Sequence, residues 1–552
     1  MAANLQLINR MIKRLIFNLN HLTLYFAISC VFLLFVSCGN TENKDNENLV
    51  FRYNEHKNIS SLDPAFSKDI ADIWATNQLF NGLVQMDDSL QIQPCIATHW
   101  DISEDAKTYT FFLRKDVKFH QHELFGKDST RLVNAYDFEY SFNRLQDPKV
   151  ASPGSWVLNK VEGYNALNDT VFQIQLKQPF PAFLGLLSMK YCSVVPKEIV
   201  TRYGSAFRSN PIGTGPFLFK RWEENVKLVL RKNPHYFEQD ENGNQLPHLE
   251  AVAITFLPDK QSEFLQFVQG NLDFLNHLDA SYKDEILTAS GELREVYSNT
   301  VNMIRGPYLN TEYLGFYMDS EVTEMQSELI RKAVNYGFDR KKMMTYLRNG
   351  VGIPASGGFI PKGLPGYNAA VGFSYEPEKA KVLIDQFKTE TGIAQPSITI
   401  TTTSNYLSFC EYIQRELQKT GLLVNVDVIP AATLKDAKAN GKLDMFRASW
   451  VADYPDAENY LSLFYSQNFA PNGPNYCHFE DVEFDGLFEQ SFTETSTAKR
   501  ELLYKKMDSL VMHKAPVVVM FYDEVVRFSQ KNVSGLGINP INLLNLKYVR
   551  KD

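Results

Sequence analysis

The sequence predicts an α/β protein of two lobes, with a β-rich insertion in the first lobe, and three observations support this fold class. The chain has 552 residues, too many for a single small core when one unit holds roughly 150 residues. The first half contains segments in which apolar and polar residues alternate strictly, as they do in half-buried strands. The second half contains a strand, a helix and another strand at the spacing of a right-handed crossover unit.

Three alternating segments in the first half predict strands whose apolar side chains share one face. Clusters of Pro, Gly and Asn separate these strands, for example at residues 233–234 and 242–244. The alternating apolar residues are Tyr109, Phe111 and Leu113, then Phe172, Ile174 and Leu176, and finally Val252, Ile254 and Phe256.

Two helices and three strands are expected in the second half. Pro377 stands where the first turn of a helix tolerates proline, and Gly421 ends a second helical stripe. The loop at residues 451–456 follows the last strand, at the end of a sheet where α/β proteins bind ligands. The helices carry Ala380, Leu383, Ile384 and Phe387, then Tyr406, Cys410, Ile413 and Leu417. The strands lie at Ile398 and Ile400, at Val424, Val426 and Val428, and at residues 444–450.

The first 48 residues have the layout of a secretory signal peptide followed by a polar tail. The almost wholly apolar stretch at residues 22–36 is shorter than the ~20 residues of a membrane-spanning helix. Cys38 follows it in a Ser-Cys-Gly sequence and predicts a lipid-modified mature N-terminus that tethers an exported protein. The alternative is an uncleaved anchor helix, and the start of translation is open between Met1 and Met11.

The composition fits a protein folded in water and argues against nucleic acid as a partner. Hydrophobic residues make up 44% of the chain and charged residues 22%, as in ordinary globular proteins. The net charge is −8 at pH 7, and no basic stripe occurs that would attract a phosphate backbone. No Gly-x-Ser-x-Gly elbow, His-Glu-x-x-His helix or Walker loop is found, which leaves only a triad assembled from distant residues as a catalytic option.

Cysteine, histidine and glycine motifs give no metal or phosphate site by their spacing. Four widely separated cysteines follow the tail, and they are expected to be buried small hydrophobes. A disulfide between two of them is the alternative. His120, His122 and Glu123 lack further ligands nearby, so a polar hairpin insertion through Arg131 is favoured over a metal cluster. The Gly-Thr-Gly sequence at residues 213–215 lacks the longer phosphate-loop pattern and is expected to form a tight turn. The cysteines are Cys95, Cys192, Cys410 and Cys477.

A series of motifs that spans nearly the whole chain after Cys38 resembles the extracytoplasmic solute-binding proteins of peptide and nickel ABC importers. Each motif is weak alone, and their order and spacing carry the resemblance. One departure is the insertion after His120, where the family usually has a tight turn. The motifs are SLDP (61–64), LFNGLV (79–84), PCIATHW (94–100), YTFFLR (109–114), VKFH (117–120), NAYDF (134–138) with Ser141, Phe142 and Arg144, GTGPF (213–217), NYGFDR (335–340) and WVADY (450–454).

The resemblance implies the two-lobed type II fold of periplasmic binding proteins, with a hinge and an extra β-rich subdomain inserted in the first lobe. Residues 1–38 would then be the lipoprotein signal peptide, which ends at Cys38, and residues 39–48 a flexible tether. The implied boundaries give lobe I residues 49–87, 192–298 and 515–552, the inserted subdomain residues 88–191, and lobe II residues 299–514.

The resemblance also implies four ligand-binding residues. Asp453 would pair with the free α-amino group of a peptide, because an ammonium group taken out of water needs a carboxylate; the alternative is an aspartate that only caps a turn. Arg447 would bind a ligand carboxylate or form an internal salt bridge. Trp450 would line the pocket or pack in the core. Tyr522 would face the ligand or lie within a core strand.

The implied function is capture of oligopeptides between the lobes and their delivery to an ABC permease and its ATPases. The protein would be a monomer without cofactor, metal or catalytic activity, in the periplasm or on the outer cell surface, with a lipid as its only membrane contact. Alternatives are binding of a nickel complex, haem or an oligosaccharide, peptide sensing without transport, and an exported hydrolase. Asp453 favours peptide, because a neutral sugar offers a buried carboxylate no cation.

Overall fold

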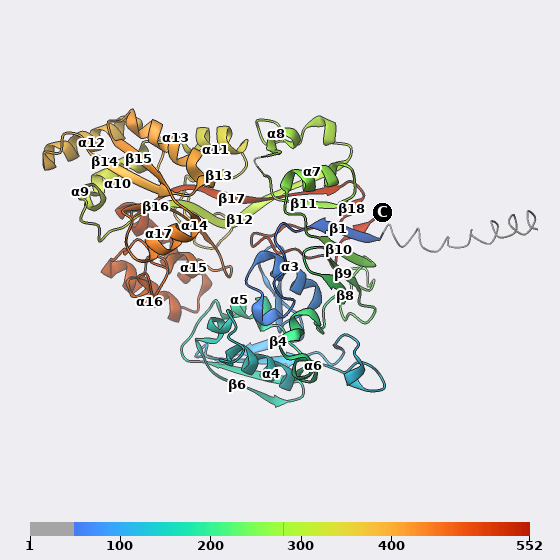
Figure 1. Cartoon of the computed structure of the whole chain (residues 1–552). Coiled ribbons are helices and arrows are strands. Elements are labelled where there is room, and N and C mark those ends of the chain that lie inside the picture. The colour runs from blue at the N-terminus through green and yellow to red at the C-terminus, as the bar shows by residue number, and fades with distance from the viewer. Residues whose placement is uncertain (1–48, 280) are drawn as a thin grey trace, which may run out of the picture. The chain divides into compact units, whose positions relative to one another are not determined.

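A mixed sheet of 11 strands joins early and late parts of the chain in this computed structural model, which describes residues 49–279 and 281–552 (Figure 1). Residues Phe51–Asp552 form one compact unit. The strand order is β15-β14-β16-β12-β17-β11-β1-β10-β9-β8, and β13 pairs with β17. The strands are β1 (Val50–Asn54), β8 (Phe217–Glu223), β9 (Lys227–Lys232), β10 (Ala251–Thr255), β11 (Phe274–Asn276), β12 (Val301–Phe316), β13 (Ile353–Pro354), β14 (Ser397–Thr402), β15 (Leu423–Val428), β16 (Met445–Val451) and β17 (Val517–Gln530).

The two longest strands, β12 and β17, lie in the middle of this sheet and connect its two parts (Figure 1). They run antiparallel, and the register shifts between Pro307 and Thr311. On one side of that shift β17 pairs with β11, and on the other side β12 pairs with β16. Because both lobes share this pair of strands, a change of twist near the shift would rotate one lobe against the other.

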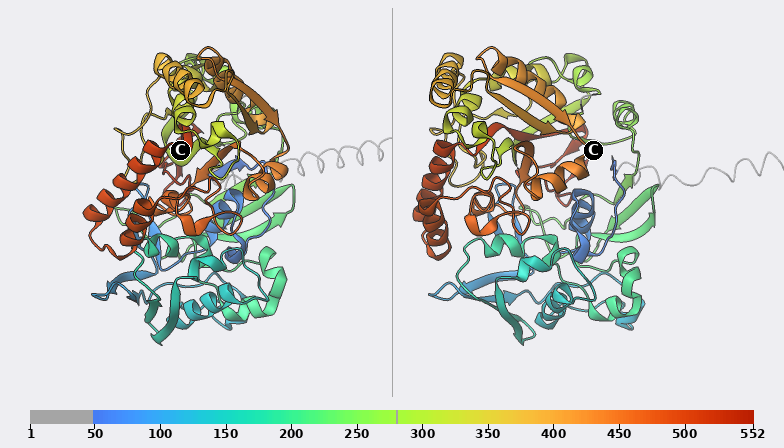
Figure 2. Two further views of the ribbon diagram at one scale, coloured as in Figure 1. Left: turned by 90° about the vertical axis from the view of Figure 1, so that its left-hand side faces the viewer. Right: turned by 60° about the vertical axis from the view of Figure 1, so that its left-hand side comes forward.

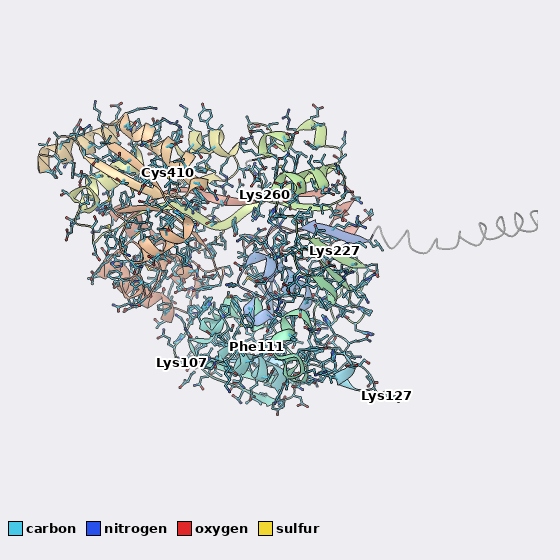
Figure 3. All side chains as sticks on the ribbon, viewed as in Figure 1. Lys107, Phe111, Lys127, Lys227, Lys260 and Cys410 are labelled. Atoms are coloured by element: carbon cyan, nitrogen blue, oxygen red, sulfur yellow. The ribbon has the colours of Figure 1, made fainter. Side chains whose placement is uncertain are left out.

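A separate four-stranded sheet confirms two of the strands expected in the first half. Its order is β4-β5-β7-β6, and its core contains Phe111 (Figure 3) together with Phe138 and Phe172. Helix α4 (Ala135–Gln146) covers it, and a capping box between Asn134 and Asp137 fixes the helix start. The strands are β4 (Ala97–Ile102), β5 (Thr108–Leu113), β6 (Val161–Asn168) and β7 (Val171–Leu176).

The strand, helix and strand expected in the second half form the predicted crossover unit, because β14 and β15 pair in parallel around α13 (Leu407–Gln418). Cys410 on α13 is buried in the core beneath it (Figure 3). Helix α12 (Pro377–Thr391) begins at Pro377, as expected. One detail differs, since Tyr406 belongs to the 3-10 turn Ser404–Tyr406 before α13 rather than to the helix. Its hydroxyl donates to the carboxylate of Glu312 over 3.1 Å, a tertiary contact that holds it outside the helix.

The remaining helices cover the sheets, and α16 and α17 pack side by side at the edge of the unit (Figure 2). They are α3 (Ile70–Leu79), α5 (Phe183–Leu187), α6 (Lys197–Tyr203), α7 (Lys260–Val268), α8 (Lys283–Ile286), α9 (Thr323–Gln326), α10 (Glu328–Tyr336), α11 (Arg340–Arg348), α14 (Ala431–Ala439), α15 (Glu458–Leu461), α16 (Val482–Thr493) and α17 (Thr497–Lys514). Two short two-stranded sheets pair β2 (Val84–Met86) with β3 (Ile92–Pro94) and β18 (Val533–Ser534) with β19 (Arg550–Lys551).

The weak motifs have local structural roles. Both ring nitrogens of His120 are engaged, Nδ1 by the Gly213 N–H at 3.3 Å and Nε2 with the Gly215 carbonyl at 3.0 Å. The ring of His122 bonds the Tyr203 hydroxyl at 3.1 Å. Gly213 is required by a close approach, because a Cβ there would lie 2.1 Å from the carbonyl oxygen of Leu79.

The four cysteines are free thiols and all are buried. Within residues 49–279 and 281–552, no helix has the length and apolar character needed to cross a membrane. The expected signal peptide with Cys38, and the expected tether, lie outside these described residues.

Candidate functional site

A cleft of about 380 Å³ brings together segments that are far apart in the sequence. One wall comes from the start of α3, around Lys68, Asp69 and Trp74, and from residues 188–191. The opposite wall comes from Tyr308 on β12 and from residues 451–453 after β16. Its volume is in the range of cavities that hold small ligands.

The end of β16 sets the position of Asp453. The last residue of the strand, Val451, pairs with Asn310 of β12, and the N–H of Ala452 donates to the Leu309 carbonyl over 2.9 Å. Ala452 is buried, whereas Asp453 is exposed in the cleft. The chain then turns toward α15, so the carboxylate stands at the strand end that was expected to bind a ligand.

Asp453 has no cationic partner within 4.0 Å among the described residues. Its backbone N–H donates to the Asn459 side-chain oxygen over 3.3 Å. The cleft walls partly desolvate the carboxyl and raise its pKa, while a hydrogen bond with the Asn459 side chain acts in the opposite direction. A carboxylate in this state gains free energy when a ligand brings a cation to it.

Trp450 supports this loop. Its indole N–H donates to the same Asn459 oxygen over 2.8 Å, and its ring packs against the core of the second lobe. Trp450 does not belong to the cleft lining. It fixes Asn459, which in turn orients the backbone of Asp453.

Arg447 is engaged inside the protein. It forms an ion pair with Glu312, which is 2% exposed, and its guanidinium carbon lies 3.3 Å from the centre of the Tyr406 ring. Glu312 also accepts hydrogen bonds from Tyr406 and from the side chain of Asn310, each over 3.1 Å. Arg447 does not line the cleft.

Tyr522 lies on β17 and is 1% exposed. Its hydroxyl donates to the Gly358 carbonyl over 2.5 Å, and its ring belongs to the core of the second lobe. Of the four predicted ligand residues, the structure therefore places only Asp453 in the cleft lining.

Other polar residues line the cleft without having been singled out from the sequence, and Asp69, Lys190, Tyr191 and Tyr308 are among them. Burial raises the pKa of Tyr191 to about 12, and the charge of Asp453, which lines the same cleft, adds to this shift. No local motif marks these residues. The only available signal was Lys190, a charge that follows the largely apolar stretch at residues 179–189.

The model of the bacterial extracellular solute-binding proteins, family 5 Middle, matches residues 91–472, which is more than half of the chain. The dipeptide-binding protein of Escherichia coli K12 is 26% identical over 487 residues, covering 84% of this chain and 87% of that protein. Heme-binding protein A of Haemophilus influenzae is 27% identical over 506 residues, covering 87% of this chain and 88% of that protein.

Solved structures share the fold. HbpA2 from Haemophilus parasuis superposes with a TM-score of 0.79 at 22% identity, covering 91% of this chain and 100% of that one. The periplasmic binding protein DppA from Helicobacter pylori, in complex with the peptide STSA, gives a TM-score of 0.73 at 24% identity, covering 91% of this chain and 98% of that one. The two-lobed fold predicted for the chain is therefore confirmed.

Proposed function

We propose that this chain, which belongs to the bacterial extracellular solute-binding proteins of family 5, captures short peptides by their free amino end. The observation that carries this proposal is the Asp453 carboxylate, which stands in the cleft without a cation from the protein. A peptide ammonium would form a charge-assisted hydrogen bond there and offset the cost of its own desolvation.

The names of relatives support a peptide as the ligand. One relative is a dipeptide-binding protein, and one structural neighbour holds the peptide STSA. Another relative is named for heme, so the ligands of this family differ. The Asp453 carboxylate is what favours a peptide over the other ligands for this chain. An ammonium group satisfies this carboxylate, whereas a neutral ligand would leave it desolvated and unpaired.

Closure of the lobes completes the proposed capture. One cleft wall comes from α3 and residues 188–191, whereas the other comes from β12 and the end of β16, which are strands of the shared sheet. Peptide binding favours the closed form by as much as the ligand prefers that form over the open one. The domain boundaries expected from the sequence are proposed as the limits of the moving bodies.

The remaining roles follow from the family and from the N-terminal sequence. The protein is exported, and a lipid on Cys38 tethers it to a membrane in the periplasm or on the outer cell surface. It acts as a monomer that delivers peptide to an ABC permease and its ATPases, and it does not turn the peptide over. A lipid mass on the mature N-terminus, and recovery of intact peptide after incubation, test the tether and the lack of turnover.

Calorimetric titration of the purified protein with trialanine and with N-acetyl-trialanine tests capture by the amino end. Trialanine is expected to bind, and N-acetyl-trialanine to bind at least ~10-fold more weakly, because acetylation removes the ammonium charge. The variant Asp453→Asn should lose affinity for trialanine and treat the two peptides alike.

Asp69→Asn is the matched control, because it removes the same charge from the same cleft. It should retain the preference for the free amine. Equal binding of both peptides by the unmodified protein would contradict capture by the amino end, and a failure to bind any peptide would contradict peptide capture itself.

A further inference from the structure

Lys190 is a cation in the cleft that the protein leaves without an anion. Its ammonium group has no hydrogen bond and no ion pair among residues 49–279 and 281–552. The side chain is partly buried and lines both the ligand cleft and a smaller side cavity of about 40 Å³ next to it. A partly desolvated ammonium group without an anion is costly, so an anion supplied by a ligand would be stabilised there.

Glu238 is the carboxylate whose charge acts on Lys190, but other donors already occupy its oxygens. Glu238 accepts from Lys547, from the Gln85 amide over 2.7 Å and from the Tyr236 hydroxyl over 3.0 Å. Lys547 is itself buried, with 4% of its surface exposed, and it adds a second positive charge that acts on Lys190. The group formed by Glu238 and Lys547 is neutral, so the charge of Lys190 is left in excess.

The surroundings hold Lys190 in place. It begins the 3-10 turn Lys190–Cys192, and both following side chains are buried. Tyr191 packs so closely on Gly154 that a Cβ at that glycine would lie 2.2 Å from the tyrosine ring. Desolvation lowers the pKa of Lys190 to about 8, which keeps most of the ammonium charged at neutral pH.

The other charged groups of the cleft differ from this one. Lys68 and Asp69 are exposed, so water screens them and their side chains are free to move. Asp453 and Lys190 face the same cleft, yet no ion pair within 4.0 Å joins them. Asp453 and Lys190 are therefore a negative and a positive group of the cleft that do not neutralise each other.

We propose that Lys190 receives a carboxylate of the ligand whose amino group Asp453 holds. This inference rests on the proposed function and deepens it. The protein would bind the peptide at two of its charged groups, the amino group at Asp453 and a carboxylate at Lys190. A peptide short enough for its terminal carboxylate to reach Lys190 meets this requirement, and so does a peptide with an acidic side chain at that position.

Calorimetric titration of three probes separates these cases. The probes are trialanine, trialanine amide and Ala-Asp-Ala amide, and the variants are Lys190→Met and, as the matched control, Lys68→Met. Loss of the carboxylate should weaken binding to the unmodified protein ~10-fold or more. Lys190→Met should weaken the binding of trialanine by the same factor and leave the binding of trialanine amide unchanged. Lys68→Met should change neither affinity by more than ~3-fold.

Rescue of binding by Ala-Asp-Ala amide would assign the subsite to an acidic side chain, and failure of rescue would assign it to the terminal carboxylate. Equal effects of Lys190→Met on trialanine and on its amide would overturn the proposal, while capture by the amino end would stand. No binding of trialanine, with or without its amide, would contradict both proposals at once. Circular dichroism and unfolding midpoints verify that each variant is folded.

Discussion

Arg447 and Asp453 lie six positions apart on one strand and the loop that follows it, and they differ in whether the protein supplies a counter-ion for their charge. Arg447 is neutralised by Glu312 and covered by Tyr406. Asp453 is exposed in the cleft and receives no cation from the described residues. The difference teaches that the charge within the strand is neutralised by an internal ion pair, whereas the charge at the cleft has no internal counter-ion among the described residues.

The largest effect is expected when the internal pair is broken on one side. Glu312→Gln leaves the Arg447 guanidinium buried without its carboxylate, which should lower the free energy of unfolding by about 3–5 kcal/mol. Denaturant titration measures this. The double variant Glu312→Leu with Arg447→Met should recover much of the loss, because no buried charge is then left unpaired. A loss below ~1 kcal/mol in the single variant would show that the pair is not a stabilising link.

A third carboxylate, Asp508, sharpens the comparison because it is fully buried and has no cation. One oxygen accepts from the Phe359 N–H over 2.7 Å, and the other has no partner among the described residues. Burial raises the pKa of Asp508 from 3.8 to about 7. The folded state therefore binds more protons than the unfolded state between these values, so stability is lost as the pH rises through this window.

Asp508→Asn should remove this loss of stability at high pH, because the substituted side chain does not ionise. At pH 8 the variant should be more stable than the unmodified protein by roughly 1–3 kcal/mol, and at pH 4 the two should be equal within error. Urea unfolding at a series of pH values gives the comparison. A parallel pH dependence in both proteins would assign the titration to another buried carboxyl, for example Glu55, whose pKa burial raises to about 8.

The smallest effect on stability is expected at Asp453, although its effect on binding is large. Because no cation among the described residues pairs with this carboxylate, Asp453→Asn should change the free energy of unfolding of the ligand-free protein by less than ~0.5 kcal/mol. Burial raises its pKa, so any change should favour the variant at neutral pH. A clear loss of stability in thermal unfolding would identify Asp453 as a structural residue instead.

Local patterns in the sequence predicted much of the fold. Pro377 marked the start of α12, and the alternation at Val424, Val426 and Val428 matched β15. Arg447 and Trp450 are three positions apart on β16, so a regular strand places them on opposite faces, and neither belongs to the cleft lining. These features depend on periodicity within a few residues, which the sequence displays directly.

The unpaired charge of Lys190 could not be predicted from local patterns in this way. Lys190 matters because Glu238 is occupied by Lys547, a residue more than 300 positions away from it. Whether a charge is paired depends on such long-range neighbours, and they are set by tertiary packing. The roles of Asp453 and Lys190 as ligand contacts stay predictions until the titrations are made.

The shared pair of strands also sets an order of events in folding. The partner of β12 is β17, and residues 317–516 separate them in the chain. At ~5–20 residues per second, a growing chain presents the edge of β12 roughly 10–40 s before β17 exists. During that interval β11 and β12 both expose unpaired backbone, which invites pairing with other chains. A product truncated before residue 517 would keep both edges open, so we expect such fragments to aggregate rather than to fold as a smaller protein.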